Sequence, residues 1–142
     1  MRPWIVAGTA LLLASSSTPV QERRHPPESR CEAVDRSRAC TLYGVSIIEL
    51  IASPRLYDGK RVRVMGWLHL EFEGNGIYLH RDDELHGLYR NGLWVSFASG
   101  STGAACARGY ALVEGRFNAA SHGHLGMWSG AIEHIDRCIR WR

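Results

Sequence analysis

The sequence predicts a mainly β protein: a five-stranded antiparallel barrel with one short N-terminal helix. Three observations support this fold class. Apolar and polar residues alternate with a period of two from Arg61 to Glu73, which is typical of a long, half-buried strand. Four shorter runs of β-forming residues follow, separated by loops and turns. Five strands favour a closed barrel, because closure removes the unpaired edges of an open sheet.

The helix is expected between Ser46 and Pro54. Ser46-Ile47-Ile48-Glu49 has the form of a capping box, in which the serine and glutamate side chains each accept a hydrogen bond from a backbone amide. Apolar residues follow at helical spacing, and Pro54 ends the helix. An Asp58-Gly59 turn then leads into the first strand.

The first strand is expected to run from residue 61 to residue 73 and to bend at Gly66. A residue without a side chain permits the curvature that a long strand in a small closed barrel needs. The positions expected to face the core are Val62, Val64, Gly66, Leu68, Leu70 and Phe72. A Gly74-Asn75-Gly76 turn leads from this strand to the second one.

The remaining strands are expected at residues 77–80, 93–97, 110–117 and about 130–141. The segments between them are expected to be loops, with one helical turn at 82–86. In the last strand Ile132 is out of phase with Ile135, Ile139 and Trp141, which predicts a bulge near Glu133 and His134. Five strands, a long bent first strand and one outer helix together indicate an OB-like barrel.

The first residues have the three regions of a secretory signal peptide. An early arginine precedes an apolar run from Ile5 to Ala14, and small residues follow to Ser17. The run is too short to span a bilayer, so no membrane-spanning segment is expected after cleavage. We therefore expect a signal peptide at 1–17, a flexible lead at 18–30 and a single OB-like domain at 31–142, in a periplasmic or secreted protein.

Four cysteines, Cys31, Cys40, Cys106 and Cys138, follow this export signal. An even number in an oxidising compartment favours two disulfides. Cys106 and Cys138 lie equally far from a hairpin turn centred near residue 122, so they are expected to face each other across the hairpin. Cys31 would then pair with Cys40. The alternative, a zinc site, is not favoured because the spacings lack the paired C-x-x-C form.

Several of these segments resemble a known family. The segments that carry the resemblance are Ile48-Glu49-Leu50, Pro54, the stretch from Tyr57 to Gly66, Val113–Phe117 and Gly130-Ala131-Ile132. They are similar to small exported bacterial OB-fold proteins of the tRNA-anticodon-like group, over about residues 45–141. The resemblance implies an OB fold. Its motifs mark how the first strand enters the barrel, and the nucleic-acid binding in the group's name does not carry over, because one fold hosts many functions.

The same alternation of residues predicts a binding face on the barrel. The candidate ligand-binding residues are Trp67, His69, Tyr78, His80, Trp94, Arg61 and Arg63. Aromatic rings beside cations on the outer surface of the second and third strands would suit stacking on bases, sugars or a partner's apolar side chains. The alternative is that residues 31–44 or the helix cover these rings, so that they complete a core.

Metal and catalytic sites are not expected. His122 and His124 with His134, or with His80 and His86, are possible ligands, but no third ligand stands at a telling spacing. The acids Asp82-Asp83-Glu84, and Glu71 with Glu73, are more typical of a solvated surface than of a catalytic pair. No G-x-S-x-G motif is present. We therefore expect no cofactor and no enzyme activity.

A binding module is the function that remains. We expect it to recognise a protein, a peptide or a glycan of the cell envelope. The net charge of +3 does not favour nucleic acid, for which a clearly basic domain is expected. Two alternatives stay open: an OB-type binder of single-stranded nucleic acid, and a metal-assisted hydrolase.

Overall fold

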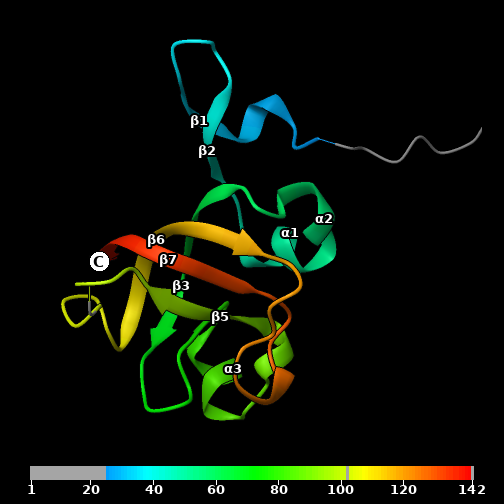
Figure 1. Cartoon of the computed structure of the whole chain (residues 1–142). Coiled ribbons are helices and arrows are strands. Elements are labelled where there is room, and N and C mark those ends of the chain that lie inside the picture. The colour runs from blue at the N-terminus through cyan, green and yellow to red at the C-terminus, as the bar shows by residue number, and fades with distance from the viewer. Residues whose placement is uncertain (1–24, 102, 142) are drawn as a thin grey trace, which may run out of the picture.

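The computed structural model describes residues 25–101 and 103–141 (Figure 1). The predicted signal peptide, 1–17, and most of the predicted lead, 18–30, lie outside these residues. The strands are β1 (Cys31–Val34), β2 (Cys40–Gly44), β3 (Arg61–His69), β4 (Gly76–Tyr78), β5 (Gly92–Phe97), β6 (Gly109–Asn118) and β7 (Ala131–Arg140). The α-helices are α1 (Ile47–Ala52), α2 (Pro54–Tyr57) and α3 (Arg81–Leu85), and the 3-10 turns are η1 (Glu28–Arg30), η2 (Tyr89–Asn91) and η3 (His124–Gly126).

Strands β3 to β7 form a closed five-stranded barrel. The strand order is β3-β4-β5-β7-β6, and β6 pairs with β3 to close the ring. This confirms the predicted mainly β, OB-like fold. The prediction that the barrel is antiparallel throughout is wrong, because β5 and β7 run parallel. An odd number of strands cannot alternate in direction around a closed ring, so at least one neighbouring pair must be parallel.

Strand β3 confirms the predicted alternation over its nine residues. Val62, Val64, Gly66 and Leu68 are buried. At Gly66 a Cβ atom would lie 2.5 Å from the carbonyl oxygen of Tyr78, so the neighbouring strand leaves no room for a side chain.

The predicted end of this strand at residue 73 is wrong. Phe72 is 92% exposed rather than core-facing, and Leu70 is only half-buried. A turn begins at Glu71, where the amide of Gly74 donates to the carbonyl oxygen of Glu71 and the side chain of Asn75 accepts from the amide of Glu71. The strand therefore ends four residues early.

The predicted N-terminal helix is present as α1, and a second short helix, α2, follows it. The hydroxyl of Ser46 accepts from the amide of Glu49 at 3.1 Å, which confirms the N-cap. The carboxylate of Glu49 instead accepts from the hydroxyl of Tyr57 at 2.5 Å and pairs with Arg30. Pro54 ends α1 and also begins α2, where its fixed φ fits the first helical position.

Both predicted disulfides are formed. The Cα atoms lie 5.7 Å apart in the Cys31–Cys40 pair and 6.0 Å apart in the Cys106–Cys138 pair. The predicted register is wrong, however, because Val113 is the residue opposite Cys138 on β6. Cys106 lies in the loop before β6, so its disulfide fastens that loop to β7.

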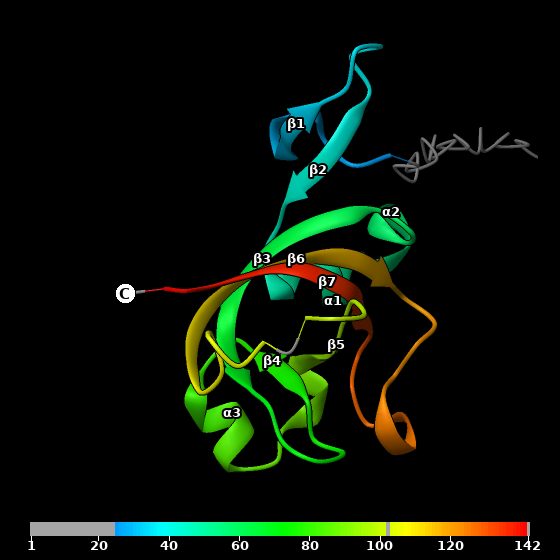
Figure 2. The ribbon, with the colours of Figure 1, turned by 60° about the vertical axis from the view of Figure 1, so that its left-hand side comes forward.

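Residues 31–44 form a hairpin that the sequence did not predict. β1 and β2 pair antiparallel, and the end of β2 pairs with β3 in parallel through Tyr43 and Gly44. Figure 2 shows this hairpin projecting from the barrel as an arm. At its base, η1 falls in the stretch expected to be a flexible lead, yet it forms a turn and its Arg30 pairs with Glu49.

The predicted bulge in β7 is confirmed. The pairing with β6 shifts between Glu114 and Arg116, and His134 has a positive φ of 53°. The expectation that Ile135, Ile139 and Trp141 share one phase is wrong, because Ile135 is buried whereas Ile139 is 43% and Trp141 54% exposed. No helix of the described part of the chain has the length and hydrophobicity needed to cross a membrane.

Candidate functional site

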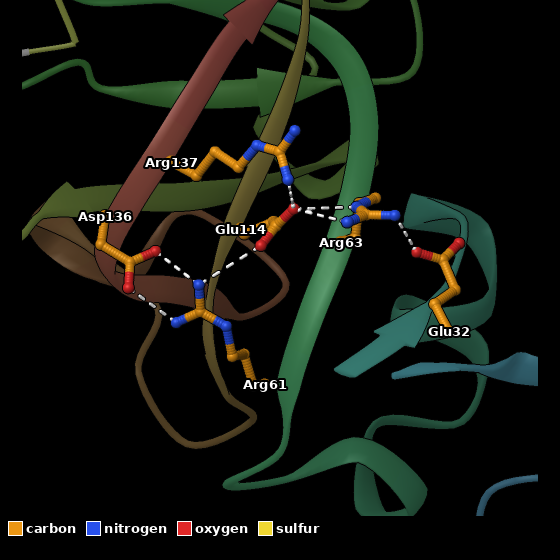
Figure 3. Close-up of polar contacts among 6 residues, drawn as sticks. All are labelled: Glu32, Arg61, Arg63, Glu114, Asp136 and Arg137. Carbon is orange, nitrogen blue, oxygen red and sulfur yellow. Dashed lines mark hydrogen bonds and ion pairs between the residues drawn. The ribbon is translucent and has the colours of Figure 1, made fainter. Parts of the chain in front are cut away.

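Arg61 and Arg63, two of the predicted ligand-binding residues, are held in an ion-pair network on the outside of the barrel (Figure 3). Its centre is the carboxylate of Glu114 on β6, a residue only 5% exposed. Arg63 donates to one oxygen of this carboxylate at 2.9 and 2.8 Å, and Arg61 lies 3.3 Å from the other. Arg137 of β7 adds a third guanidinium at 3.0 Å.

Two further carboxylates balance these charges. Asp136 accepts two hydrogen bonds from Arg61, at 2.8 and 2.6 Å, and Glu32 of the hairpin arm pairs with Arg63. The network therefore joins three arginines to three acids and links β1, β3, β6 and β7. Arg61 and Arg63 both have carboxylate partners within the protein, so neither offers an unpaired charge to a ligand.

The network lowers the pKa values of Glu114 and Asp136. Burial raises the pKa of Glu114, but the hydrogen bonds and charges of the three arginines outweigh burial and hold the value below the usual range. Hydrogen bonding from Arg61 lowers the pKa of Asp136. Both carboxylates are therefore ionised at neutral pH and already bound, which makes them poor general acids or bases.

Beside the network, the outer surface of β3, β6 and β7 is apolar. The register places Met65 beside Leu112 and Leu112 beside Ile139, and it places Trp67 beside Tyr110. The amide of Trp141 donates to the carbonyl oxygen of Tyr110, which brings the last tryptophan into the same row. We call this surface the outer apolar face; its residues are Met65, Trp67, Tyr110, Leu112, Ile139 and Trp141.

Four of the six residues of the outer apolar face are exposed, and Trp67 and Leu112 are half-buried. Met65 and Trp141 are 52% and 54% exposed, and Tyr110 and Ile139 are each 43% exposed. Of its six residues, only Trp67 was predicted to bind a ligand. Tyr110 and Leu112 could have been predicted from the sequence, because they alternate along β6 with the core positions Ala111 and Val113.

Trp67 and His80 lie together at one end of this face. The ring of Trp67 packs edge-on against Tyr110 with a centroid distance of 5.6 Å, and the Arg81 guanidinium lies 5.9 Å from the Trp67 centroid. His80 is exposed, with Nδ1 3.5 Å from the Tyr110 hydroxyl. The indole nitrogen of Trp67 is buried and has no hydrogen-bond partner among the described residues.

His69 is largely covered and lies between two carboxylates. Its side chain is 14% exposed, with Nδ1 3.3 Å from Glu84 and Nε2 3.2 Å from Glu71. Since Glu84 belongs to α3, this contact fastens the helix to the end of β3. His69 thus acts as an anchor rather than as an exposed ligand group.

Tyr78 and Trp94 lie on a different part of the barrel, under the loop between β6 and β7. Trp128 of this loop is fully buried, and its indole nitrogen donates to the Tyr78 hydroxyl at 3.1 Å. Tyr78 lies opposite the outer residue Trp67 in the sheet but is 1% exposed, so its ring is covered rather than part of an open binding face. Burial raises the pKa of Tyr78 to about 12.

The alternative to a binding face was that residues 31–44 or the helix cover the aromatic rings. The loop of residues 119–130 covers Tyr78 and Trp94 instead. Trp94 is half-buried and packs edge-on against Trp128 at 4.9 Å, and Tyr89 packs against the same ring at 5.0 Å. Trp128 was the missed residue, because it falls at the end of a segment predicted only as a long turn.

A polar hollow lies beside Trp94, which we call the Trp94 hollow. Its lining residues are Glu73, Asn75, Trp94, Ser121, His122, Gly123 and His124. His122 donates from Nδ1 to the carbonyl oxygen of Trp128 at 3.0 Å, and His124 lies 3.7 Å from Glu73. Across residues 25–101 and 103–141, no three histidine, cysteine or acidic side chains are grouped so as to hold a metal ion.

Comparison with protein-family models, with curated proteins and with solved structures finds no match to this chain. The resemblance to the tRNA-anticodon-like group stays a prediction.

Proposed function

We propose that the protein is an exported binding module that recognises a polypeptide through its outer apolar face. The observation that carries this proposal is the exposure of neighbouring apolar side chains across three paired strands. Large contiguous apolar surfaces on proteins outside membranes commonly mark interaction sites. Aromatic residues and methionine are also enriched where proteins meet, and this face contains Trp67, Tyr110, Trp141 and Met65.

The charges around the face favour a polypeptide over nucleic acid. A single-strand binder needs unpaired cations along a groove together with stacking rings. Here Arg61 and Arg63 are paired with acids in the network next to the face. Leu112 and Ile139 are aliphatic and suit the apolar side chains of a polypeptide better than they suit bases or sugar hydroxyls.

The disulfides support the proposed location outside the cytoplasm. Two disulfides join the described cysteines, and such bonds persist in oxidising compartments. With the export signal expected at residues 1–17, this supports a periplasmic or secreted protein. We propose that it acts by binding alone, since the most buried acid, Glu114, is held by three arginines.

Photo-crosslinking in an envelope extract tests this proposal. A photoreactive amino acid at position 139, on the face, should form a covalent adduct with a discrete polypeptide. The same amino acid at position 72 is the matched control, because Phe72 is 92% exposed and lies off the face. Adducts formed equally at both positions, or at neither, would contradict the proposal.

Affinity measurements make the test quantitative. Once the crosslinked polypeptide is identified and purified, Met65→Ser and Ile139→Ser should each weaken its binding by at least about tenfold, whereas Phe72→Ser should leave it unchanged. Thermal unfolding of each variant shows whether the fold is kept. If a labelled oligothymidylate bound instead, with an affinity that fell steeply as salt rose, the nucleic-acid alternative would replace this proposal.

A further inference from the structure

The Trp94 hollow is built from elements that take no part in the outer apolar face. Trp94 comes from β5, Glu73 and Asn75 come from the turn between β3 and β4, and the remaining lining residues come from the loop between β6 and β7. The hollow is a shallow surface depression of about 510 Å³ that is wide open to solvent. A ligand there would meet one indole ring and side chains of several polar types.

The indole of Trp94 is held rigidly. One part of the ring packs against Trp128. Gly123 also lies so close to the ring that a Cβ atom on it would be 2.6 Å from Cδ2 of Trp94. A ring fixed in this way can stack on a ligand without losing conformational entropy on binding.

The polar groups of the hollow offer both donors and acceptors. The side-chain oxygen of Asn75 already accepts from the amide of Glu71, so its amide nitrogen has hydrogen atoms left to donate. A carbonyl oxygen only accepts, so His122 must donate from Nδ1 to Trp128, and Nε2 of the neutral ring is then an acceptor. Ser121 adds a hydroxyl, which both donates and accepts.

We propose that the Trp94 hollow binds a neutral sugar unit of a glycan. The apolar face of the sugar ring lies against the indole, and its hydroxyls, which both donate and accept, bond to Asn75, Ser121 and His122. An anion is disfavoured by the carboxylate of Glu73. The hollow and the outer apolar face share no residue, so this proposal and the polypeptide proposal can fail separately.

Titration with neutral trisaccharides tests this inference. The probes are trimers of glucose, N-acetylglucosamine, mannose and galactose, added to the mature protein up to about 10 mM. Binding is followed by NMR through the indole N–H signal of Trp94, which Trp94→Phe identifies. At least one trimer should shift this signal with saturation. No saturable shift with any of the trimers would overturn the proposal.

Two substitutions then locate the contacts. Asn75→Asp keeps the oxygen that accepts from Glu71 but removes the amide donors, and Ser121→Ala removes only the hydroxyl. Each should weaken the trisaccharide by at least about fivefold while thermal unfolding stays unchanged. Leu125→Ser is the matched control, because this residue of the same loop is 81% exposed and does not line the hollow.

The outcomes separate the two sites. Loss of sugar binding with Asn75→Asp and Ser121→Ala, but not with Leu125→Ser or with Ile139→Ser, supports a sugar site in the hollow. Binding that survives both hollow variants, or that is lost with Ile139→Ser, overturns it and assigns the sugar to another surface. Neither result affects the crosslinking expected at position 139.

Discussion

Arg63 of β3 donates two hydrogen bonds to one carboxylate oxygen of Glu114 on β6, at 2.9 and 2.8 Å. The carboxylate belongs to a residue that is 5% exposed, although it lies on the outer side of the barrel. Guanidinium groups of three arginines surround this carboxylate and satisfy both of its oxygens. This pair is therefore closer to a buried ion pair than to a surface salt bridge.

Removing the central charge should destabilise the barrel. Glu114→Gln leaves three guanidinium groups close together without their shared anion, so we expect the free energy of unfolding to fall by about 2–3 kcal/mol. Urea unfolding followed by circular dichroism measures this change. Glu28→Gln, an exposed acid in η1, is the control and should change stability by less than about 0.5 kcal/mol. Equal effects would show that the network contributes no special stability.

The same network makes stability depend on pH in the acidic range. The pKa values of Glu114 and Asp136 are lower in the folded protein than their ordinary values of 4.5 and 3.8. The stabilisation is therefore complete above the unfolded pKa values and is lost as pH falls through the folded ones. Urea unfolding between about pH 6 and pH 2 should show this loss, and the loss should be smaller in a Glu114→Gln, Asp136→Asn double variant.

Gly66 should tolerate no side chain. A Cβ atom there would lie 2.5 Å from the carbonyl oxygen of Tyr78, which cannot move without disturbing β4, and 2.7 Å from the buried side chain of Ile47. We expect Gly66→Ala to lower the free energy of unfolding by about 2–3 kcal/mol. Gly74→Ala is the matched control, because its new Cβ would meet only the flexible Glu71 side chain. Similar midpoints of urea unfolding for both variants would contradict this reasoning.

The strand pattern of the barrel could be predicted because its inner residues obey a simple period. Val62, Val64 and Leu68 are buried as the alternation requires, and the bulge at His134 was visible as a break in phase. The parallel pairing of β5 with β7 could also have been predicted, since five strands in a closed ring require it. No turn in the sequence marks this pairing, because β6 separates β5 from β7 along the chain.

The candidate site was predicted less well because alternation says which side of a strand a residue takes, not what lies over it. Trp67 and Tyr78 are cross-strand neighbours, yet Trp67 borders an exposed face and Tyr78 is covered by Trp128. Likewise Arg61 and Arg63 lie outside the barrel as expected, but acids far away in the sequence neutralise them. Long-range contacts of this kind leave no local signal.

The two disulfides should differ in their effects on stability. The Cys106–Cys138 bond closes a loop of 32 residues and links residues 103–107 to the barrel, so replacing both cysteines by serine should cost about 3–4 kcal/mol. The Cys31–Cys40 bond lies within the projecting arm. Its removal should lower the global free energy of unfolding by less than about 1 kcal/mol and should instead speed hydrogen exchange in β1 and β2. Equal losses of global stability would show that the arm and the barrel unfold as one unit.

Trp128 should control both the stability of the barrel and the ionisation of Tyr78. Its ring is fully buried against Trp94 and Tyr89, and its indole nitrogen donates to the Tyr78 hydroxyl. Trp128→Ala should lower the free energy of unfolding by about 3–5 kcal/mol, because it opens a large cavity. Trp128→Phe keeps most of the ring and should cost less.

The pKa of Tyr78, raised to about 12 chiefly by burial, should fall toward its ordinary value of 10.0 in Trp128→Ala as water reaches the hydroxyl. Since the pKa is raised in the folded state, the stabilisation linked to it is complete below pH 10 and is lost as pH rises toward 12. Spectrophotometric titration of tyrosinate, with Tyr78→Phe to identify the signal, measures the shift. An unchanged pKa of Tyr78 in Trp128→Ala would mean that β4 and β5, rather than the loop, exclude water from the Tyr78 hydroxyl.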